Sequence, residues 1–361
     1  MEKRIFNFNP GPAAQPLSVL KKIQKDFLNY NNTGMSIIEI SHRSDEFMEI
    51  LEYTKARIKR LYNLSDKWNI IFVPGGASLQ FAMLAMNLLP ENTQGEYINT
   101  GTWSTKAIQE AQIQKKNIKV TASSEDRSFS YIPENFTTDD KSAFLHITTN
   151  NTVRGTQWHK IPDLNIPIAA DMCSDILSRP LDIEKFGIIY AGIQKNIGPS
   201  GTALVLIHDD MLKLIPDDLP TMLSYKTYIN KDSMHNTPST FAIYCCGLVL
   251  KWIEEDMGGL KGIEDLNKRK AGYIYDEIDS SGGFYKGTAE IKDRSLMNAT
   301  FRLPDEDLEK KFVQEASKIG LGGLKGHRSA GGIRASLYNA VPETGVKALA
   351  EFMKKFRKDN S

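Results

Sequence analysis

Residues 187–207 read GIIYAGIQKNIGPSGTALVLI, two apolar runs separated by a glycine-rich turn that contains one lysine, Lys195. The runs are apolar at successive positions, which is typical of strands buried on both faces of a covered sheet. Ile193 and Ile197 flank the lysine and leave it no solvated face, whereas most lysines extend into solvent. Because apolar surroundings disfavour the ammonium form, the sequence predicts that Lys195 can act as a neutral, nucleophilic amine.

Five further β-rich runs precede this stretch and alternate with helical or mixed segments. Two amphipathic helices, with apolar stripes over 17–27 and 47–61, come before them, and a helix over 78–89 follows the first run. The alternation predicts an α/β fold whose large domain is built on a mostly parallel, seven-stranded sheet. The five runs are NIIFV (69–73), EYIN (96–99), NIKVTA (117–122), AFLHIT (143–148) and IPIAAD (166–171).

The C-terminal part of the chain has a different pattern. NTPSTFAIYCCGLVLKWIEEDM (236–257) predicts a long buried helix with Thr237 as N-cap and Pro238 at the first helical position. GGLKG (258–262) is interpreted as a hinge, and a smaller α+β domain follows. We expect an N-terminal segment (1–15), a large domain (16–258) and a small domain (259–361), the last with helices over 263–279, 305–319 and 343–357 and strands over 296–303 and 332–339.

The composition restricts the classes of partner. The 361 residues include 45 Lys and Arg against 44 Asp and Glu, a net charge of +1, so no nucleic-acid partner is expected. The longest apolar run, 241–250, is too short to cross a bilayer, and the opening MEKRIFNFNPGP lacks the apolar core of a signal peptide. Three cysteines, at 173, 245 and 246, make neither a disulfide framework nor a zinc set. We expect a reduced, cytoplasmic protein with no membrane partner and no bound metal.

Polar residues at the ends of the strands indicate a ligand site, since open α/β sheets bind ligands at the carboxyl ends of their strands. Asp171 ends an apolar run; it is either a cap or ion-paired loop residue, or the partner of a buried cation. PGGAS (74–78) leads into a helix and is either an ordinary turn or a phosphate cradle. A lysine nucleophile, an acid to keep a ring nitrogen protonated and a phosphate turn are together the parts of a pyridoxal 5'-phosphate (PLP) site.

Four other residues fit this interpretation by type. Trp103, in TGTWS, is either a stacking partner for the cofactor or an ordinary buried tryptophan. Thr152, in NNTVRGTQW, provides a hydroxyl near the end of another strand. Asn236 and Thr237 precede a helix N-terminus, where they either bind an anion or cap the helix.

Two His-Arg pairs provide cations in an otherwise balanced chain. One is His42–Arg43, in SHRS, and the other is His327–Arg328, in GHRSAGGIRAS, which also contains Arg334. Exposed arginines are usually solvated, but a guanidinium also binds a phosphate or a carboxylate through two parallel hydrogen bonds. The pattern therefore favours a substrate that carries several negative charges.

Nine blocks, in order along the chain, support a resemblance to a known family: FNFNPGPA, SHRS, GGASLQF, TGTWS, NNTVRGTQ, ILSRP, AGIQKNIGPSG, NTPSTFAIY and GHRSAGGIRASLYNA. Over essentially its whole length the chain resembles the phosphoserine aminotransferase family, in class V of the fold-type I PLP-dependent transferases. The resemblance implies reversible amino transfer from L-glutamate to 3-phosphohydroxypyruvate, giving O-phospho-L-serine and 2-oxoglutarate in L-serine biosynthesis. It also implies a homodimer with shared active sites. Action on 4-phosphohydroxy-L-threonine, for vitamin B6 synthesis, is left open.

The resemblance implies a role for each candidate residue. Lys195 would form the Schiff base with the cofactor, and Asp171 would hold the proton on the pyridine nitrogen. Trp103 would stack on the ring and Thr152 would contact its phenolic oxygen. The cofactor phosphate would be bound by Ala77, Ser78 and Gln194, and by Asn236 and Thr237 of the other subunit. The substrate α-carboxylate would be bound by Arg334. The substrate phosphate or the glutamate side chain would be bound by His42, Arg43, His327 and Arg328.

The chain departs from the family pattern at two places. Ser78 stands where some relatives have arginine, and Met172, Cys173 and Asp175 replace a serine-rich stretch. The resemblance does not explain Asp175. Two other functions stay open from the residues: a class V aminotransferase for an uncharged substrate, and a non-catalytic ligand-binding protein. The His-Arg pairs argue against the first, and the joint presence of a nucleophilic lysine and a strand-end acid argues against the second.

Overall fold

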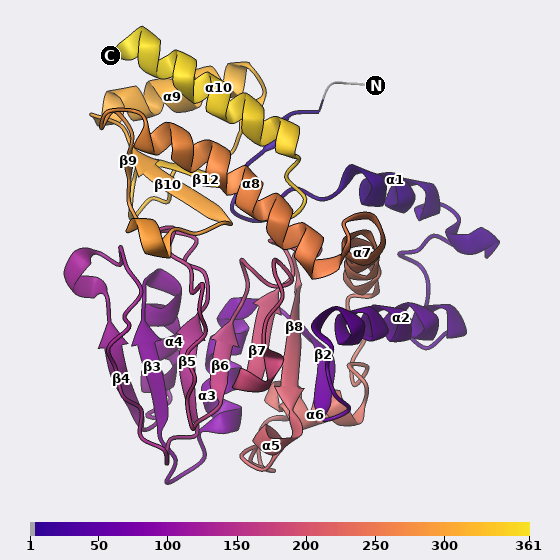
Figure 1. Cartoon of the computed structure of the whole chain (residues 1–361). Helices are drawn as coiled ribbons and strands as arrows, with labels where there is room; N and C mark the ends of the chain where they lie inside the picture. Colours follow the sequence, from indigo (N-terminus) through magenta and orange to yellow (C-terminus); the bar gives the residue numbers. More distant parts are fainter. Residues whose placement is uncertain (1–3) are drawn as a thin grey trace.

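All seven strands expected from the apolar runs are present in the computed structural model, which describes residues 4–361 (Figure 1). They are β2 (Trp68–Pro74), β3 (Gly95–Asn99), β4 (Ile118–Ser123), β5 (Phe144–Thr148), β6 (Ile168–Asp171), β7 (Phe186–Gly192) and β8 (Thr202–His208). They form one sheet in the order β2–β8–β7–β6–β5–β3–β4. Only β8 runs antiparallel to its neighbours, so the predicted α/β fold with a mostly parallel, seven-stranded sheet is confirmed.

Helices cover both faces of the sheet, which explains the continuous apolar runs. Every residue of β3, β5, β6 and β7 is buried, whereas the edge strand β4 is partly exposed. One face packs against α3 (Ala77–Leu88), α4 (Thr102–Ile113), α5 (Asp209–Leu212) and α6 (Tyr225–Asn230). The other packs against α1 (Leu17–Asp26), α2 (Asp45–Tyr62) and α7 (Thr240–Lys251). Single 3-10 turns lie at η1 (Tyr30–Asn32), η2 (Glu125–Arg127), η3 (Ile183–Lys185) and η4 (Thr221–Leu223).

The long helix expected from Thr237 begins later than the sequence predicts. Ser239 is the N-cap of α7, and the N–H of Thr240 donates to the Pro238 carbonyl at 2.9 Å. That bond closes a tight turn ahead of the helix, so the prediction of Thr237 as N-cap is wrong. The C-terminal end changes to a π-helix, η5 (Trp252–Asp256).

The hinge expected over 258–262 is shorter than predicted. Only Gly258 and Gly259 have left-handed backbone, at φ 73° and 71°, which glycine adopts without steric cost. Helix α8 (Gly259–Asp279) already includes the rest of the segment. From beside α7 it runs into the small domain, where it packs against the last helix of the chain (Figure 1).

The C-terminal part forms the α+β layer that its pattern predicts. Strands β9 (Lys286–Gly287), β10 (Asn298–Arg302) and β12 (Ile333–Ser336) pair antiparallel in the order β12–β10–β9. The last strand is shorter than expected, because residues 337–339 leave the sheet. Around the sheet lie α8, α9 (Glu306–Lys318), α10 (Glu343–Asn360) and the turn η6 (Ile291–Asp293).

The N-terminal segment joins the small domain. Strand β1 (Phe6–Asn7) pairs in parallel with β11 (Leu321–Gly322), and Phe8 is fully buried in the small-domain core. The segment then continues over the large domain toward α1. Across residues 4–361, no helix combines the length and the apolar character needed to span a bilayer.

Candidate active site

The carboxyl ends of four neighbouring strands bring the central candidate residues together. Asp171 is the last residue of β6, and Lys195 lies in the turn after β7. Thr152 lies in the loop after β5, and Trp103 is in the first turn of α4, which follows β3. This is the edge at which an open α/β sheet binds its ligands.

Lys195 extends toward Thr152 and Trp103. Its Nζ lies 3.2 Å from Thr152 Oγ1 and 5.2 Å from the centre of the Trp103 ring. Ile193 and Ile197 are both fully buried and hold the turn against the core. The amine is therefore fixed between a hydroxyl and the flat face of an indole.

The N-terminal segment covers this turn. Ala13 N–H donates to the Gln194 carbonyl at 3.0 Å, and Gln15 Nε2 donates to the Gly198 carbonyl at 3.1 Å. A Cβ at Gly11, whose φ is +138°, would lie 3.1 Å from Lys195 Cγ. Only glycine lets the segment approach the lysine stem this closely.

Asp171 is a buried carboxylate that forms no ion pair within residues 4–361. Its exposed fraction is 3%, and Oδ1 accepts a hydrogen bond from Cys173 N–H at 2.9 Å. Burial raises the pKa of Asp171, while the charge of Lys195 and the hydrogen bond from Cys173 act in the opposite direction. A buried carboxylate needs a cationic partner, and the protonated ring nitrogen of PLP is a cation of the right kind.

Arg334 reaches the same site from β12 of the small domain. Its exposed fraction is 6%, and Nη1 donates to the Thr152 carbonyl at 3.2 Å. Its Nε is buried without a hydrogen-bond partner, and across residues 4–361 no carboxylate lies within the 4.0 Å of an ion pair. Burial lowers the pKa of Arg334. An unpaired, buried guanidinium fits a carboxylate supplied by a ligand.

His327 lies close to Arg334 and to two further positive charges. Burial lowers the pKa of His327, and the positive charges of Arg334, Arg328 and Lys106 lower it further. The Lys106 ammonium also lies 4.9 Å from the Trp103 ring. Sequence analysis did not identify Lys106, although its position three residues after Trp103 on a helix places both on one face.

The phosphate turn and the lysine turn are joined by a hydrogen bond. Gly75, with φ +89°, donates its N–H to the Gly201 carbonyl at 3.0 Å, and α3 begins two residues later at Ala77, followed by the exposed Ser78. Gln194 folds back over Gly192, since a Cβ there would lie 2.6 Å from Gln194 Oε1. Ala77, Ser78 and Gln194 thus lie on two connected turns at the N-terminus of α3, a position that favours the binding of an anion.

Four candidate residues are not brought to this site by the single chain. His42 and Arg43 lie in the turn before α2, and Asn236 and Thr237 lie before α7. Within residues 4–361, no hydrogen bond or ion pair joins any of them to Lys195, Asp171 or Arg334. Asn236 Nδ2 instead donates to the adjacent Thr237 carbonyl. Their roles stay predictions that require a second subunit.

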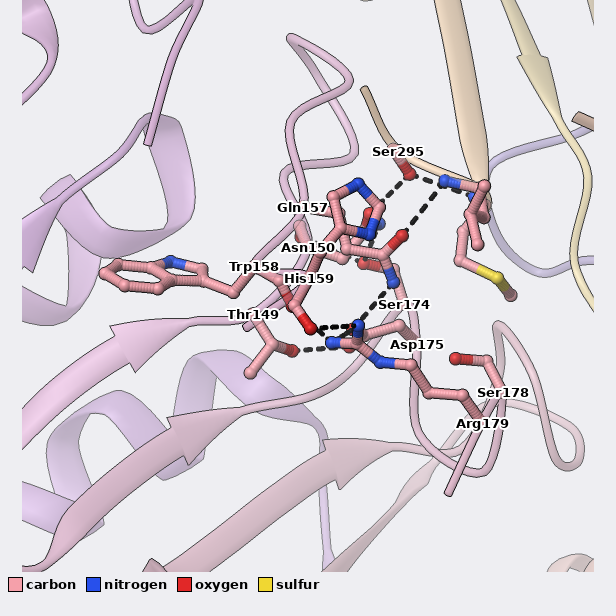
Figure 2. A network of polar contacts seen from close by, with 12 residues as sticks. Thr149, Asn150, Gln157, Trp158, His159, Ser174, Asp175, Ser178, Arg179 and Ser295 are labelled. Carbon is pink, nitrogen blue, oxygen red and sulfur yellow. Dashed lines mark hydrogen bonds and ion pairs between the residues drawn. The ribbon is translucent and has the colours of Figure 1, made fainter. Parts of the chain in front are cut away.

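Asp175, which the sequence left unexplained, points into a buried polar network behind the site (Figure 2). Its carboxylate accepts hydrogen bonds from Thr149 Oγ1 and from Gln157 Nε2, the latter at 3.1 Å, and lies 3.9 Å from Arg179 Nη2. Burial raises the pKa of Asp175, and the Arg179 charge and both hydrogen bonds oppose this shift. Thr149 and Gln157 are at the two ends of the loop that carries Thr152.

The same network connects the loop to the small domain. Asn150 Nδ2 donates to Ser174 Oγ at 2.8 Å and to Asn298 Oδ1 at 2.7 Å. Gln157 Oε1 accepts from the Leu296 N–H at 2.9 Å. Figure 2 shows Asn150 and Ser295 facing each other across the two parts of the chain. The loop that positions Thr152 is therefore fixed from both domains.

Cys173 is a further buried group at this edge. Its Sγ accepts the Gly192 N–H at 3.1 Å, and burial together with the Asp171 charge raises the pKa of its thiol far above the ordinary range. The thiol stays protonated and links β6 to the start of the lysine turn. The sequence indicated no role for Cys173 in the site.

Comparison with known proteins gives consistent matches over the whole chain. The sequence profile of the family Aminotransferase class-V matches residues 5–349. A phosphoserine aminotransferase of Desulfosudis oleivorans (strain DSM 6200 / JCM 39069 / Hxd3) is 56% identical over 361 residues, which is 100% of both chains. The phosphoserine aminotransferase structure from Bacillus circulans subsp. alkalophilus is 46% identical, with a TM-score of 0.96 and 99% of each chain covered. The PLP-bound enzyme from Trichomonas vaginalis is 37% identical, with a TM-score of 0.92 over 97% of this chain and 100% of that one.

Proposed function

The chain belongs to the class-V aminotransferases, and from this premise we infer that it is a PLP-dependent phosphoserine aminotransferase. It transfers an amino group reversibly from L-glutamate to 3-phosphohydroxypyruvate, giving O-phospho-L-serine and 2-oxoglutarate in L-serine biosynthesis. The observation that carries the proposal is the position of Lys195 Nζ, 3.2 Å from Thr152 Oγ1 and beside Trp103, at the strand edge that holds the unpaired Asp171.

The unpaired buried groups fit PLP and a substrate carboxylate. Lys195 would hold the cofactor covalently through Nζ, and Asp171 would keep the ring nitrogen protonated. When bound, PLP supplies an electron-accepting ring that stabilises negative charge on the substrate Cα. Trp103 would stack on that ring, Thr152 would donate to its phenolic oxygen, and Ala77, Ser78 and Gln194 would bind its phosphate.

The proton transfers are assigned to Lys195. Its Nζ would be the base that takes a proton from the substrate Cα and delivers it to the aldehyde carbon of the cofactor. Arg334 binds the substrate α-carboxylate and so orients Cα toward that amine. The phosphate of phosphoserine and the distal carboxylate of glutamate are bound by His327 and Arg328, together with His42 and Arg43.

The proposal includes a homodimer in the cytoplasm. Asn236 and Thr237 would complete the cofactor phosphate site of the partner. Apolar side chains on α1 and the loop that follows are exposed, among them Leu28 at 82% and Ile38 at 52%, as expected for a surface covered by another subunit. All three cysteines are unpaired and buried, which supports a reducing compartment.

The test is spectroscopic and kinetic. The purified, PLP-loaded enzyme is expected to be yellow, and O-phospho-L-serine should convert it to the colourless amine form of the cofactor. Lys195→Ala should abolish turnover. Arg328→Ala should reduce kcat/KM for phosphoserine roughly 30- to 5,000-fold, which corresponds to a loss of about 2–5 kcal/mol of transition-state stabilisation. The kcat/KM for L-alanine should change little. Equal rates with phosphoserine and L-alanine in the wild type would instead favour a class V enzyme for uncharged substrates.

A further inference from the structure

A fully buried lysine lies outside the catalytic edge. Lys270, on α8, has an exposed fraction of 0%. Its Nζ donates to the carbonyls of Leu337 at 2.8 Å and Tyr338 at 2.7 Å, and lies 3.3 Å from the Val341 carbonyl and 3.5 Å from that of Asn339. Across residues 4–361, no carboxylate forms an ion pair with it. We call these four carbonyls the carbonyl cage and residues 337–341 the strap.

The carbonyl cage fits an ammonium ion. Burial lowers the pKa of Lys270 to about 7, and the charge of Glu343 opposes this shift. Carbonyl oxygens only accept hydrogen bonds, so the three N–H groups of the ammonium use the cage better than the two of a neutral amine. Hydrogen bonds to the strap and the charge of Glu343 therefore offset part of the free energy that it costs to bury the ammonium.

The strap holds the residue next to Lys195. Asn339 N–H donates to Asn196 Oδ1 at 2.9 Å, and Asn196 Nδ2 donates to the Ile176 carbonyl at 2.6 Å. Asn267, three residues before Lys270 on the same helix, donates to Asn339 Oδ1 at 2.9 Å. These side chains are at most 2% exposed, so their bonds are shielded from water.

The strap also holds the N-terminal segment that covers Lys195. Tyr338 Oη donates to the Pro10 carbonyl at 2.9 Å, and the next residue, Gly11, packs against the Lys195 stem. The strap directly follows β12, which carries Arg334. It therefore contacts the lysine turn directly through Asn339 and indirectly through the N-terminal segment, and it continues from the strand that carries Arg334.

We propose that Lys270 is a positioning residue: its buried ammonium holds the strap in the shape that fixes Asn196 and Gly11, and through them the turn of the cofactor-binding lysine. The proposal rests on the proposed function insofar as Lys195 binds PLP. Lys270 does not touch the cofactor or the substrate; it acts through hydrogen bonds of the strap.

The test compares Lys270→Ala and Lys270→Met with Lys268→Ala, a control on the same helix whose side chain is 53% exposed. Wild type and variants are titrated with PLP by quenching of tryptophan fluorescence, and kcat and KM are measured with phosphoserine. Both Lys270 variants should bind PLP about tenfold more weakly, the change expected from the loss of one buried hydrogen bond at the site. Their kcat should fall by about 100-fold, as expected for misplacement by about 1 Å, with a smaller change in KM. Lys268→Ala should match the wild type.

Chemical rescue separates positioning from general stability. Lys270→Ala lacks three carbons and the nitrogen, which n-propylammonium replaces. Millimolar n-propylammonium should restore both PLP affinity and kcat in this variant, and should have no effect on Lys270→Met, where the space is filled. Rescue of the melting temperature without rescue of PLP affinity would overturn the proposal, and so would wild-type PLP affinity in both variants.

A variant in the middle of the strap, at Asn339, covers the case in which Lys270→Ala does not fold. Asn339→Ala keeps the carbonyl cage and removes two side-chain hydrogen bonds to α8 and to the Leu177 carbonyl. It should show the same loss of PLP affinity and of kcat; unchanged values would overturn the proposal. Failure of the wild type to bind PLP or to use phosphoserine would instead refute the proposed function, because that measurement does not depend on Lys270.

Discussion

Replacing Arg334 by methionine should change ligand-free stability and ligand binding in opposite directions. In the ligand-free protein the guanidinium is 6% exposed, makes one hydrogen bond, to the Thr152 carbonyl, and has no carboxylate partner within residues 4–361. It is thus a buried charge whose partner is expected to come from the substrate. Methionine has a similar volume and no charge, so it removes the desolvation cost together with the binding function.

The magnitudes follow from these contacts. Replacing a poorly compensated buried charge by an apolar side chain of similar volume stabilises a protein by about 1–4 kcal/mol, and the lost hydrogen bond to Thr152 costs about 1 kcal/mol. The ligand-free variant should therefore be as stable as the wild type or more stable, by up to about 3 kcal/mol. Losing the partner of a bound carboxylate should weaken ligand binding by about 2–5 kcal/mol, roughly 30- to 5,000-fold.

Thermal unfolding with and without glutarate measures both effects. Glutarate has the two carboxylates of glutamate and lacks its amino group, so it tests binding without turnover. At 100 times its Kd it should stabilise the PLP-loaded wild type by about 2.7 kcal/mol, and the same concentration should stabilise Arg334→Met by less than about 1 kcal/mol. Arg269→Met, an exposed position on α8, controls for net charge. A variant that melts below the wild type without ligand, yet binds glutarate equally well, would refute the interpretation of Arg334 as a buried, ligand-seeking cation.

Two further predictions concern buried polar groups. Asp175→Asn keeps the oxygen that accepts from Thr149 Oγ1, but it replaces the oxygen that accepts from Gln157 Nε2 and faces Arg179 by an NH2 donor. It should therefore lower the free energy of unfolding by about 1.5–3 kcal/mol and reduce kcat by loosening the Thr152 loop. Asp210→Asn, at an exposed position, is the control, and unchanged stability with unchanged kcat would contradict the role of the network. Burial lowers the pKa of His146 from 6.5 to about 3, so below pH 6.5 the unfolded chain binds a proton that the native state does not, and stability falls as the pH falls. Urea unfolding between about pH 7.5 and about pH 5.5 should show a loss about 1 kcal/mol larger in the wild type than in His146→Leu; equal losses would show that His146 is protonated in the native state.

The large sheet was predictable because its strands are buried on both faces. A run such as the one in β7 has no polar position, and only a covered, mostly parallel sheet accommodates it. Lys195 and Asp171 were predictable for the related reason that a charged group directly after such a run has no solvent to reach. Their position at one sheet edge follows from strand direction alone.

Features that depend on contacts between distant segments were not predictable. Strand β1 has two residues, too few to show an alternation of apolar and polar side chains. It forms because its backbone pairs with β11. Lys270 sits among exposed charges in LNKRKAG, and its sequence neighbours look like a solvated helix face. The direction of Asp175 is set by Thr149 and Gln157, which no local pattern connects to it. The start of α7 was misplaced because the Pro238 carbonyl bonds within its own turn, a choice that residue type does not reveal.

Because β1 pairs with β11, the N-terminal segment can take its final position only after most of the chain has been synthesised. Phe6 and Phe8 leave the ribosome long before the small-domain residues that receive them, Leu321 and the surrounding core. Until that domain emerges, the segment around Gly11 has no anchor with which to cover the lysine turn. A nascent chain can therefore form the seven-stranded sheet with Lys195 at its edge early, while the N-terminal segment does not yet cover Lys195. The N-terminal segment can therefore cover Lys195 only when synthesis is nearly finished.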